Sequence, residues 1–168
     1  WFDGALQDIG FNNPPTWSVI GGSISQLIPI TQTTYLLFPL FDLLLLLGGC
    51  WFLYWGFGYL GPLIFILIFS TSYISAFNWN MGSYFRFLWL FELMAAVSFL
   101  KKGRYLEAGI FLAISTLMRV FPIFFAIGAF LPLLSNFVKR KESSHKVLKN
   151  FLVGFLTTSF ILITISVI

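Results

Sequence analysis

Charged residues are scarce in this chain. Asp, Glu, Lys and Arg make up 10% of its 168 residues, whereas hydrophobic residues make up 58%. A soluble domain carries about 25% charged residues. A chain of this length buries only about two-thirds of its surface on folding, so much apolar surface stays outside. The scarcity of charge therefore excludes a water-soluble domain and predicts a protein that lies in a lipid bilayer.

Cysteine is nearly absent as well. The single Cys50 lies inside an apolar run, which excludes a disulfide framework and a metal site built on cysteine spacing. No nucleophile elbow, Walker loop or dinucleotide fingerprint is present. The chain opens at Trp1 without a basic leader and stops at Ile168 inside a hydrophobic segment, so we expect it to be a piece of a longer polytopic protein.

Long hydrophobic runs, in contrast, fill most of the sequence. Such runs reach the length at which a helix crosses a hydrocarbon core of about 30 Å. We predict an all-α fold, a polytopic transmembrane helix bundle over residues 32–168, preceded by an outer-face interfacial loop with short amphipathic helices over residues 1–31. The expected helices span residues 35–54, 59–77, 84–100, 106–118 paired with 121–134, and 151–168.

Most basic residues occur in two short clusters, Lys101–Arg104 and Lys139–Lys149. The positive-inside rule assigns both clusters to the cytoplasm, and their apolar flanks exclude a nucleic-acid partner. The segment between them must then return to the face that it left. We therefore predict a broken, re-entrant-like helix pair around residues 105–134, with its break at Arg119–Pro122 on the outer side.

Two arginines are candidate ligands for a phosphate group. Arg119 stands inside an apolar stretch, where a cation costs roughly 2.5 to 3.5 kcal/mol, and its guanidinium can hold a phosphate with two parallel hydrogen bonds. Snorkelling or a pair with Glu92 is the alternative interpretation. Arg86 is one turn into its predicted helix, where it reaches headgroups without a partner. Asp42 and Glu92, near the middle of their predicted helices, are expected to pair helices together.

The polar loops expected on the outer face hold the remaining candidates. Asp3 and Asp8 are candidate catalytic carboxylates that act as a general base or bind a divalent cation, the only candidate cofactor, although solvated loop acids are the plainer interpretation. Asn78 and Asn80 belong to an outer-face loop and fit turn or capping roles. His145 is expected to be solvated in a cytoplasmic loop.

The stretch KKGRYLEAGIFLAISTLMRVFP, Lys101 to Pro122, resembles a pattern in polyprenyl-phosphate-sugar-dependent glycosyltransferases of the C superfamily, with a mannosyltransferase-like character. There a basic turn, a small-residue step and an apolar arm precede a basic residue and Pro. The resemblance implies sugar transfer from a polyprenyl-phosphate donor to an acceptor on the non-cytoplasmic face, with Arg119 near the donor phosphate. It also implies an essential acid in the first outer loop, which is either Asp3 or Asp8 or lies upstream of Trp1.

Two other functions fit the same residues. Broken helices with an intramembrane charge are also typical of transporters and flippases, although the chain has no clear internal repeat. A non-catalytic membrane scaffold would use Asp42, Glu92, Arg86 and Arg119 only to join helices, with small residues at the packing faces. The resemblance favours the bacterial inner membrane as the location.

Overall fold

The computed structural model describes residues 15–29, 31–72, 85–119, 121–128 and 142–167, and within these ranges every regular element is a helix. The prediction of an all-α fold is confirmed for this part of the chain. The helices with bounds are α2 (Pro15–Leu27), α3 (Gln32–Leu37), α4 (Pro39–Phe57), α5 (Leu60–Thr71), α6 (Leu88–Lys101), α7 (Tyr105–Met118) and α9 (Glu142–Val167). Residues 123–128 are also helical.

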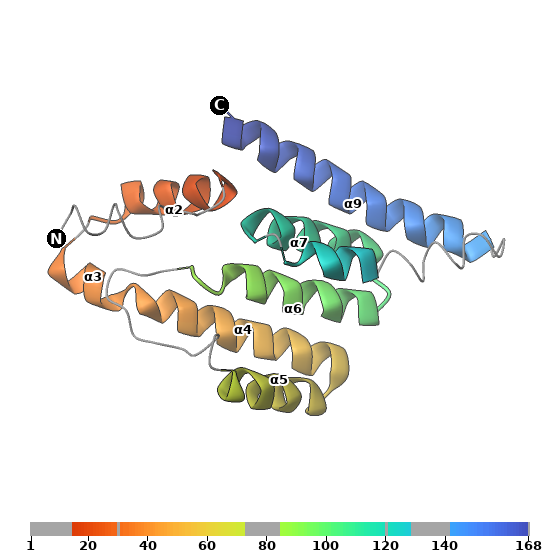
Figure 1. Ribbon diagram of the computed structural model, residues 1–168, viewed down its shortest axis with the longest axis horizontal. Coiled ribbons are helices and arrows are strands. Elements are labelled where there is room, and N and C mark those ends of the chain that lie inside the picture. The colour runs from red at the N-terminus through yellow and green to blue at the C-terminus, as the bar shows by residue number, and fades with distance from the viewer. Residues whose placement is uncertain (1–14, 30, 73–84, 120, 129–141, 168) are drawn as a thin grey trace.

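Five helices lie side by side in the order α5, α4, α6, α7 and α9 (Figure 1). Helices α4 and α6 run in the same direction, because Asp42 contacts Arg86 near their starts while Gly56 lies against Ser98 near their ends. Helix α7 runs back along α6 after a short turn. Helix α5 runs back along α4 after a turn at Gly58, whose φ of 71° is a conformation that favours glycine.

Small residues let these helices approach closely. Ala95 and Ala96 of α6 and Ala108 of α7 are fully buried. A Cβ atom added at Gly56 would lie 2.9 Å from Cβ of Ser98, and one added at Gly109 would collide with the backbone of α9 at Phe151. Close backbone approach through small residues is the packing mode that helices use where lipid supplies no hydrophobic driving force.

The outer surfaces of this helical layer are apolar. None of the residues of α5 is buried, and Leu67 and Ile68 are more than 60% exposed. Two segments, Gln32–Phe57 and Lys146–Ser166, are long and apolar enough to cross a membrane, and Leu60–Thr71 and Tyr105–Met118 are shorter apolar helices.

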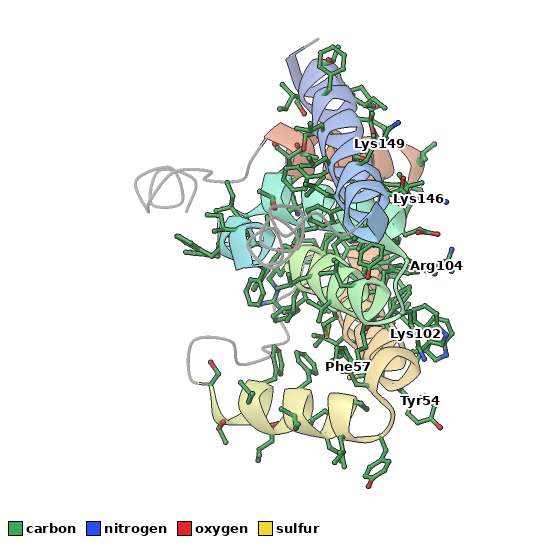
Figure 2. The ribbon with its side chains drawn as sticks, turned by 90° about the vertical axis from the view of Figure 1, so that its right-hand side faces the viewer. Tyr54, Phe57, Lys102, Arg104, Lys146 and Lys149 are labelled. Atoms are coloured by element: carbon green, nitrogen blue, oxygen red, sulfur yellow. The ribbon has the colours of Figure 1, made fainter. Side chains whose placement is uncertain are left out.

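Positive charge gathers at one end of the layer. We call this the basic end: it comprises the α4–α5 turn, the α6–α7 turn and the first turns of α9. Seven Lys and Arg side chains are described, and the five at this end are Lys101, Lys102, Arg104, Lys146 and Lys149. Figure 2 views the molecule from this end and shows Tyr54 and Phe57 near Lys102, with Arg104, Lys146 and Lys149 above them.

Several predicted helix bounds need correction. The first predicted helix, residues 35–54, lies within the apolar segment Gln32–Phe57, which consists of α3 and α4 joined at Phe38. The third begins at Leu88 and not at residue 84. The last begins at Glu142, so that Lys146 and Lys149, expected in a loop, lie on a helix.

The predicted break in the helix at Arg119–Pro122 is confirmed. Helix α7 ends at Met118, Arg119 is extended with φ −150° and ψ 145°, and a new helical stretch covers residues 123–128. This stretch folds back along α6 and α7, because Phe124 and Gly128 line the same pocket as Leu112.

Candidate functional site

The end of the layer opposite the basic end contains a buried ion pair. Nε of Arg86 donates a hydrogen bond to Oδ2 of Asp42 at 2.9 Å. The Asp42 side chain is fully buried, whereas the Arg86 side chain is 26% exposed. We call this the arginine end: it comprises Asp42, Arg86 and Arg119. The pair joins the first turn of α4 to the turn that precedes α6.

Asp42 also contacts the backbone at the start of α6. The N–H of Phe87, the residue before Leu88, lies 3.5 Å from Oδ1 of Asp42. The first N–H groups of a helix lack partners within the helix, and a carboxylate there is favoured by the helix dipole. Phe85 has a φ of 57°, a left-handed conformation that is strained for a side chain of this size. The Arg86 guanidinium lies 5.5 Å from the centroid of the Phe87 ring.

Arg119 lies at the same end of the α6–α7 pair. Its N–H donates to the carbonyl oxygen of Ser115 at 3.0 Å, which closes the last turn of α7, and its side chain is exposed. Oγ of Ser115 donates to the carbonyl oxygen of Trp89 at 2.6 Å, so the last turn of α7 lies against the first turn of α6. Arg119 is one turn beyond Ser115, and Arg86 is three residues before Trp89.

This arrangement has the chemistry of an anion site. Two guanidinium groups and one carboxylate leave the arginine end with a net positive charge among its described side chains. Guanidinium groups bind carboxylates and phosphates through parallel hydrogen bonds, and Asp42 orients one of the two.

One sequence-based interpretation of the charged residues is wrong. Arg86 was expected to reach headgroups without a partner, but it is paired with Asp42, because the parallel packing of α4 on α6 brings their first turns together. The expectation that Asp42 pairs helices together is confirmed, since this ion pair joins α4 to the turn before α6.

The alternative pair between Arg119 and Glu92 does not form among the described residues. Glu92 lies on the buried side of α6 with 8% of its surface exposed, whereas Arg119 points outward. Oε2 of Glu92 has no hydrogen-bond partner within the part of the chain that the structure describes. Glu92 is nine residues before Lys101, the basic residue of the last turn of α6, so it lies between the two ends.

The remaining sequence candidates fall outside the description. Asp3, Asp8, Asn78 and Asn80 lie outside the described residues. The backbone of His145 belongs to α9, but its side chain is outside the description too. Of the predicted site residues, Arg86 and Arg119 are therefore described, and both lie at the arginine end.

Sequence reasoning did not identify Arg86 as the partner of Asp42, nor did it find the link from Ser115 to Trp89. A signal for the first was present, since one carboxylate and one guanidinium stand in separate apolar runs and intramembrane charges pair with one another. Serine is too common in apolar helices for Ser115 to stand out.

Comparison of the chain with protein-family models, with curated proteins and with solved structures gave no match.

Proposed function

We propose that the chain is part of a multi-pass protein of a bacterial inner membrane, with the basic end in the cytoplasm and the arginine end toward the opposite face. Two helices of sufficient length and apolar character, with exposed apolar surface on α4, α5 and α9, support this proposal. The gathering of five described cations and of exposed aromatic rings at one end supports the orientation.

The lengths of the helices then give the depth of the arginine end. Helices α6 and α7 have 14 residues each, which is about 21 Å at the helical rise. Asp42 is 15 residues from the end of α4, or about 23 Å. If the basic end lies at one interface of a hydrocarbon core of about 30 Å, then Asp42, Arg86 and Arg119 lie inside the core, short of the other interface. Charges and broken backbone at that depth require protein or a wet cavity around them.

We further propose that the parent protein is a glycosyltransferase that uses a polyprenyl-phosphate-linked sugar. The observation that carries this proposal is that Arg119, at a helix break, and Arg86, held by buried Asp42, lie at the same end of the bundle. Long arginine side chains extend toward the interface, where a lipid phosphate lies, and two guanidinium groups match its charge and geometry.

The reaction follows from these roles. A carboxylate of the outer loop, Asp3 or Asp8, takes the proton of the acceptor hydroxyl, whose oxygen attacks the anomeric carbon of the donor sugar. The bond from that carbon to the phosphate oxygen breaks, and the polyprenyl phosphate leaves with the electron pair. Arg119 and Arg86 stabilise the negative charge that develops on the leaving phosphate. Asp42 acts as a positioning residue for Arg86.

Sugar transfer by the intact parent protein tests this function. We expect Arg119→Gln to lower the transfer rate by about 100-fold, the effect of removing one charge-stabilising donor. Arg119→Lys, which keeps the charge but not the paired hydrogen bonds, is expected to recover part of that loss. Arg104→Gln is the matched control, because Arg104 is exposed at the basic end and pairs with Glu107.

The result that contradicts the proposal is unchanged transfer by Arg119→Gln, or no binding of polyprenyl phosphate by the wild type. Uptake of a substrate by reconstituted protein without sugar transfer would indicate a transporter instead.

Labelling of single cysteines tests the orientation separately, in protein whose Cys50 is replaced by Ser. Phe121→Cys, beside the helix break, is expected to react with a membrane-impermeant reagent from the outer face, and Lys146→Cys from the cytoplasm; both side chains are exposed. Labelling of both from the same face would refute the orientation.

A further inference from the structure

The hydroxyl of Ser115 joins two helices. Hydroxyls of α6, α7 and α9 commonly donate to the carbonyl oxygen four residues back in their own helix, as Thr116 does to Leu112 at 2.7 Å. Such a bond satisfies the hydroxyl but does not fix the helix to its neighbours. Oγ of Ser115 in α7 instead donates to the carbonyl oxygen of Trp89 in α6 at 2.6 Å. Since a carbonyl oxygen has two lone pairs, Trp89 can accept this bond in addition to one from within its own helix.

The bond between Ser115 and Trp89 lies inside the bundle. Ser115 is fully buried, and Trp89 packs against the hydrophobic core. A buried hydroxyl has no water to bind, so breaking the bond would leave polar groups without a partner. The bond is therefore a fixed point between the last turn of α7 and the first turn of α6.

The backbone of Arg119 is held on both sides by residues of the bundle interior. Its N–H donates to the carbonyl oxygen of Ser115 at 3.0 Å. Met118 before it and Pro122 three residues after it are both buried. Arg119 is extended between them, and its side chain is exposed. The Cα position of Arg119 therefore depends on how the end of α7 is fixed, whereas its guanidinium is free to contact a ligand.

Arg86 is tied to the other partner of the same bond. It lies three residues before Trp89, and Asp42 binds both its guanidinium and the N–H of Phe87 before α6. Helices α6 and α7 run in opposite directions (Figure 1), so the residues before Trp89 and the residues after Ser115 lie on the same side of the bond. The bond between Ser115 and Trp89 is thus a direct polar link between the segments that carry the two arginines.

We propose that Ser115 is a positioning residue for the phosphate site of the arginine end, because its hydrogen bond to Trp89 sets the placement of Arg119 relative to Arg86. This inference rests on the proposed glycosyltransferase function. Ser115 is buried and acts through Arg119, which contacts the phosphate. Removal of the hydroxyl leaves both guanidinium groups in place but releases the end of α7 from α6, so the two groups no longer meet one phosphate in a fixed arrangement.

Binding of polyprenyl phosphate to the intact parent protein tests this proposal. A displacement of about 1 Å at a binding group costs about 100-fold in rate, and a loosened group costs less, so we expect Ser115→Ala to weaken binding by about 10-fold. The variant removes one atom and adds none, so the packing of the core remains. Thr116→Val is the matched control, because it removes the neighbouring hydroxyl, whose bond stays within α7. It is expected to bind like the wild type.

A double variant separates positioning from support of the fold. If Ser115 acts through Arg119, then Ser115→Ala weakens binding by less than about 2-fold in protein that already carries Arg119→Gln, because no guanidinium remains to be positioned. A residue that only supports the fold would cause the same loss in both backgrounds.

Three results would overturn this inference and leave the proposed function intact, provided that Arg119→Gln weakens binding. They are unchanged binding by Ser115→Ala, an equal loss in Thr116→Val, and the same loss from Ser115→Ala with and without Arg119. Absence of binding by the wild type, or unchanged binding by Arg119→Gln, would instead overturn the proposed function and this inference with it.

Discussion

Removing the carboxylate of Asp42 is expected to destabilise the protein strongly. Asp42→Asn leaves the Arg86 guanidinium without its counter-charge, and breaking a buried ion pair from one side costs about 3 to 5 kcal/mol. Arg86 is 26% exposed, which places the effect near the lower limit, about 3 kcal/mol. Asparagine keeps an acceptor for the N–H of Phe87, so the contact at the start of α6 remains.

Removing the other partner of the ion pair is expected to lower the free energy of unfolding more. Arg86→Gln leaves the fully buried carboxylate of Asp42 unpaired, which lowers the free energy of unfolding by about 4 kcal/mol or more. The double variant Asp42→Asn/Arg86→Gln removes both charges and is expected to be less destabilised than Arg86→Gln alone, because no charge then stays unpaired. Reversible unfolding in mixed micelles titrated with sodium dodecyl sulfate, followed by tryptophan fluorescence, measures each free energy.

The exposed ion pair serves as the control. Arg104 and Glu107 form an ion pair on the surface, with side chains 53% and 32% exposed, and Glu107→Gln is expected to cost under about 1 kcal/mol. If the costs of Asp42→Asn and Arg86→Gln simply add in the double variant, the two groups are not coupled. That result would refute the ion pair as the feature that joins α4 to α6.

Three further variants test other parts of the packing by the same unfolding measurement. Gly109→Leu forces a side chain into the backbone of α9 at Phe151 and is expected to cost about 3 kcal/mol or more; a neutral effect would refute the close crossing of α7 and α9. Ser115→Ala removes the hydrogen bond to Trp89 and is expected to cost about 0.6 kcal/mol, the average for such bonds between membrane helices. Glu92→Gln is expected to be neutral or stabilising, because Oε2 has no partner in the described part of the chain, and a loss above about 1 kcal/mol would contradict that.

The local features of the chain could be predicted from the sequence. Apolar runs longer than a soluble helix and Arg119 followed by Pro122 are local signals, because helix formation and helix breakage depend on neighbouring residues. The helix break at Arg119 was found in this way. The bounds were less accurate, since a helix end depends on caps such as the contact from Asp42 to the N–H of Phe87.

The sequence by itself determined that the described part of the chain is helical, that its cations gather between apolar runs, and where the helix after Tyr105 breaks. Only the tertiary structure decided that Asp42 pairs with Arg86, 44 residues away, while Glu92 does not pair with Arg119. Hydropathy is a sum over neighbouring residues and reports burial or lipid exposure. Pairing of charges depends on which helices are neighbours, whether they run parallel, and how each is rotated. Small residues such as Gly56 and Gly109 decide which helices are neighbours, because they allow the helix backbones to approach closely.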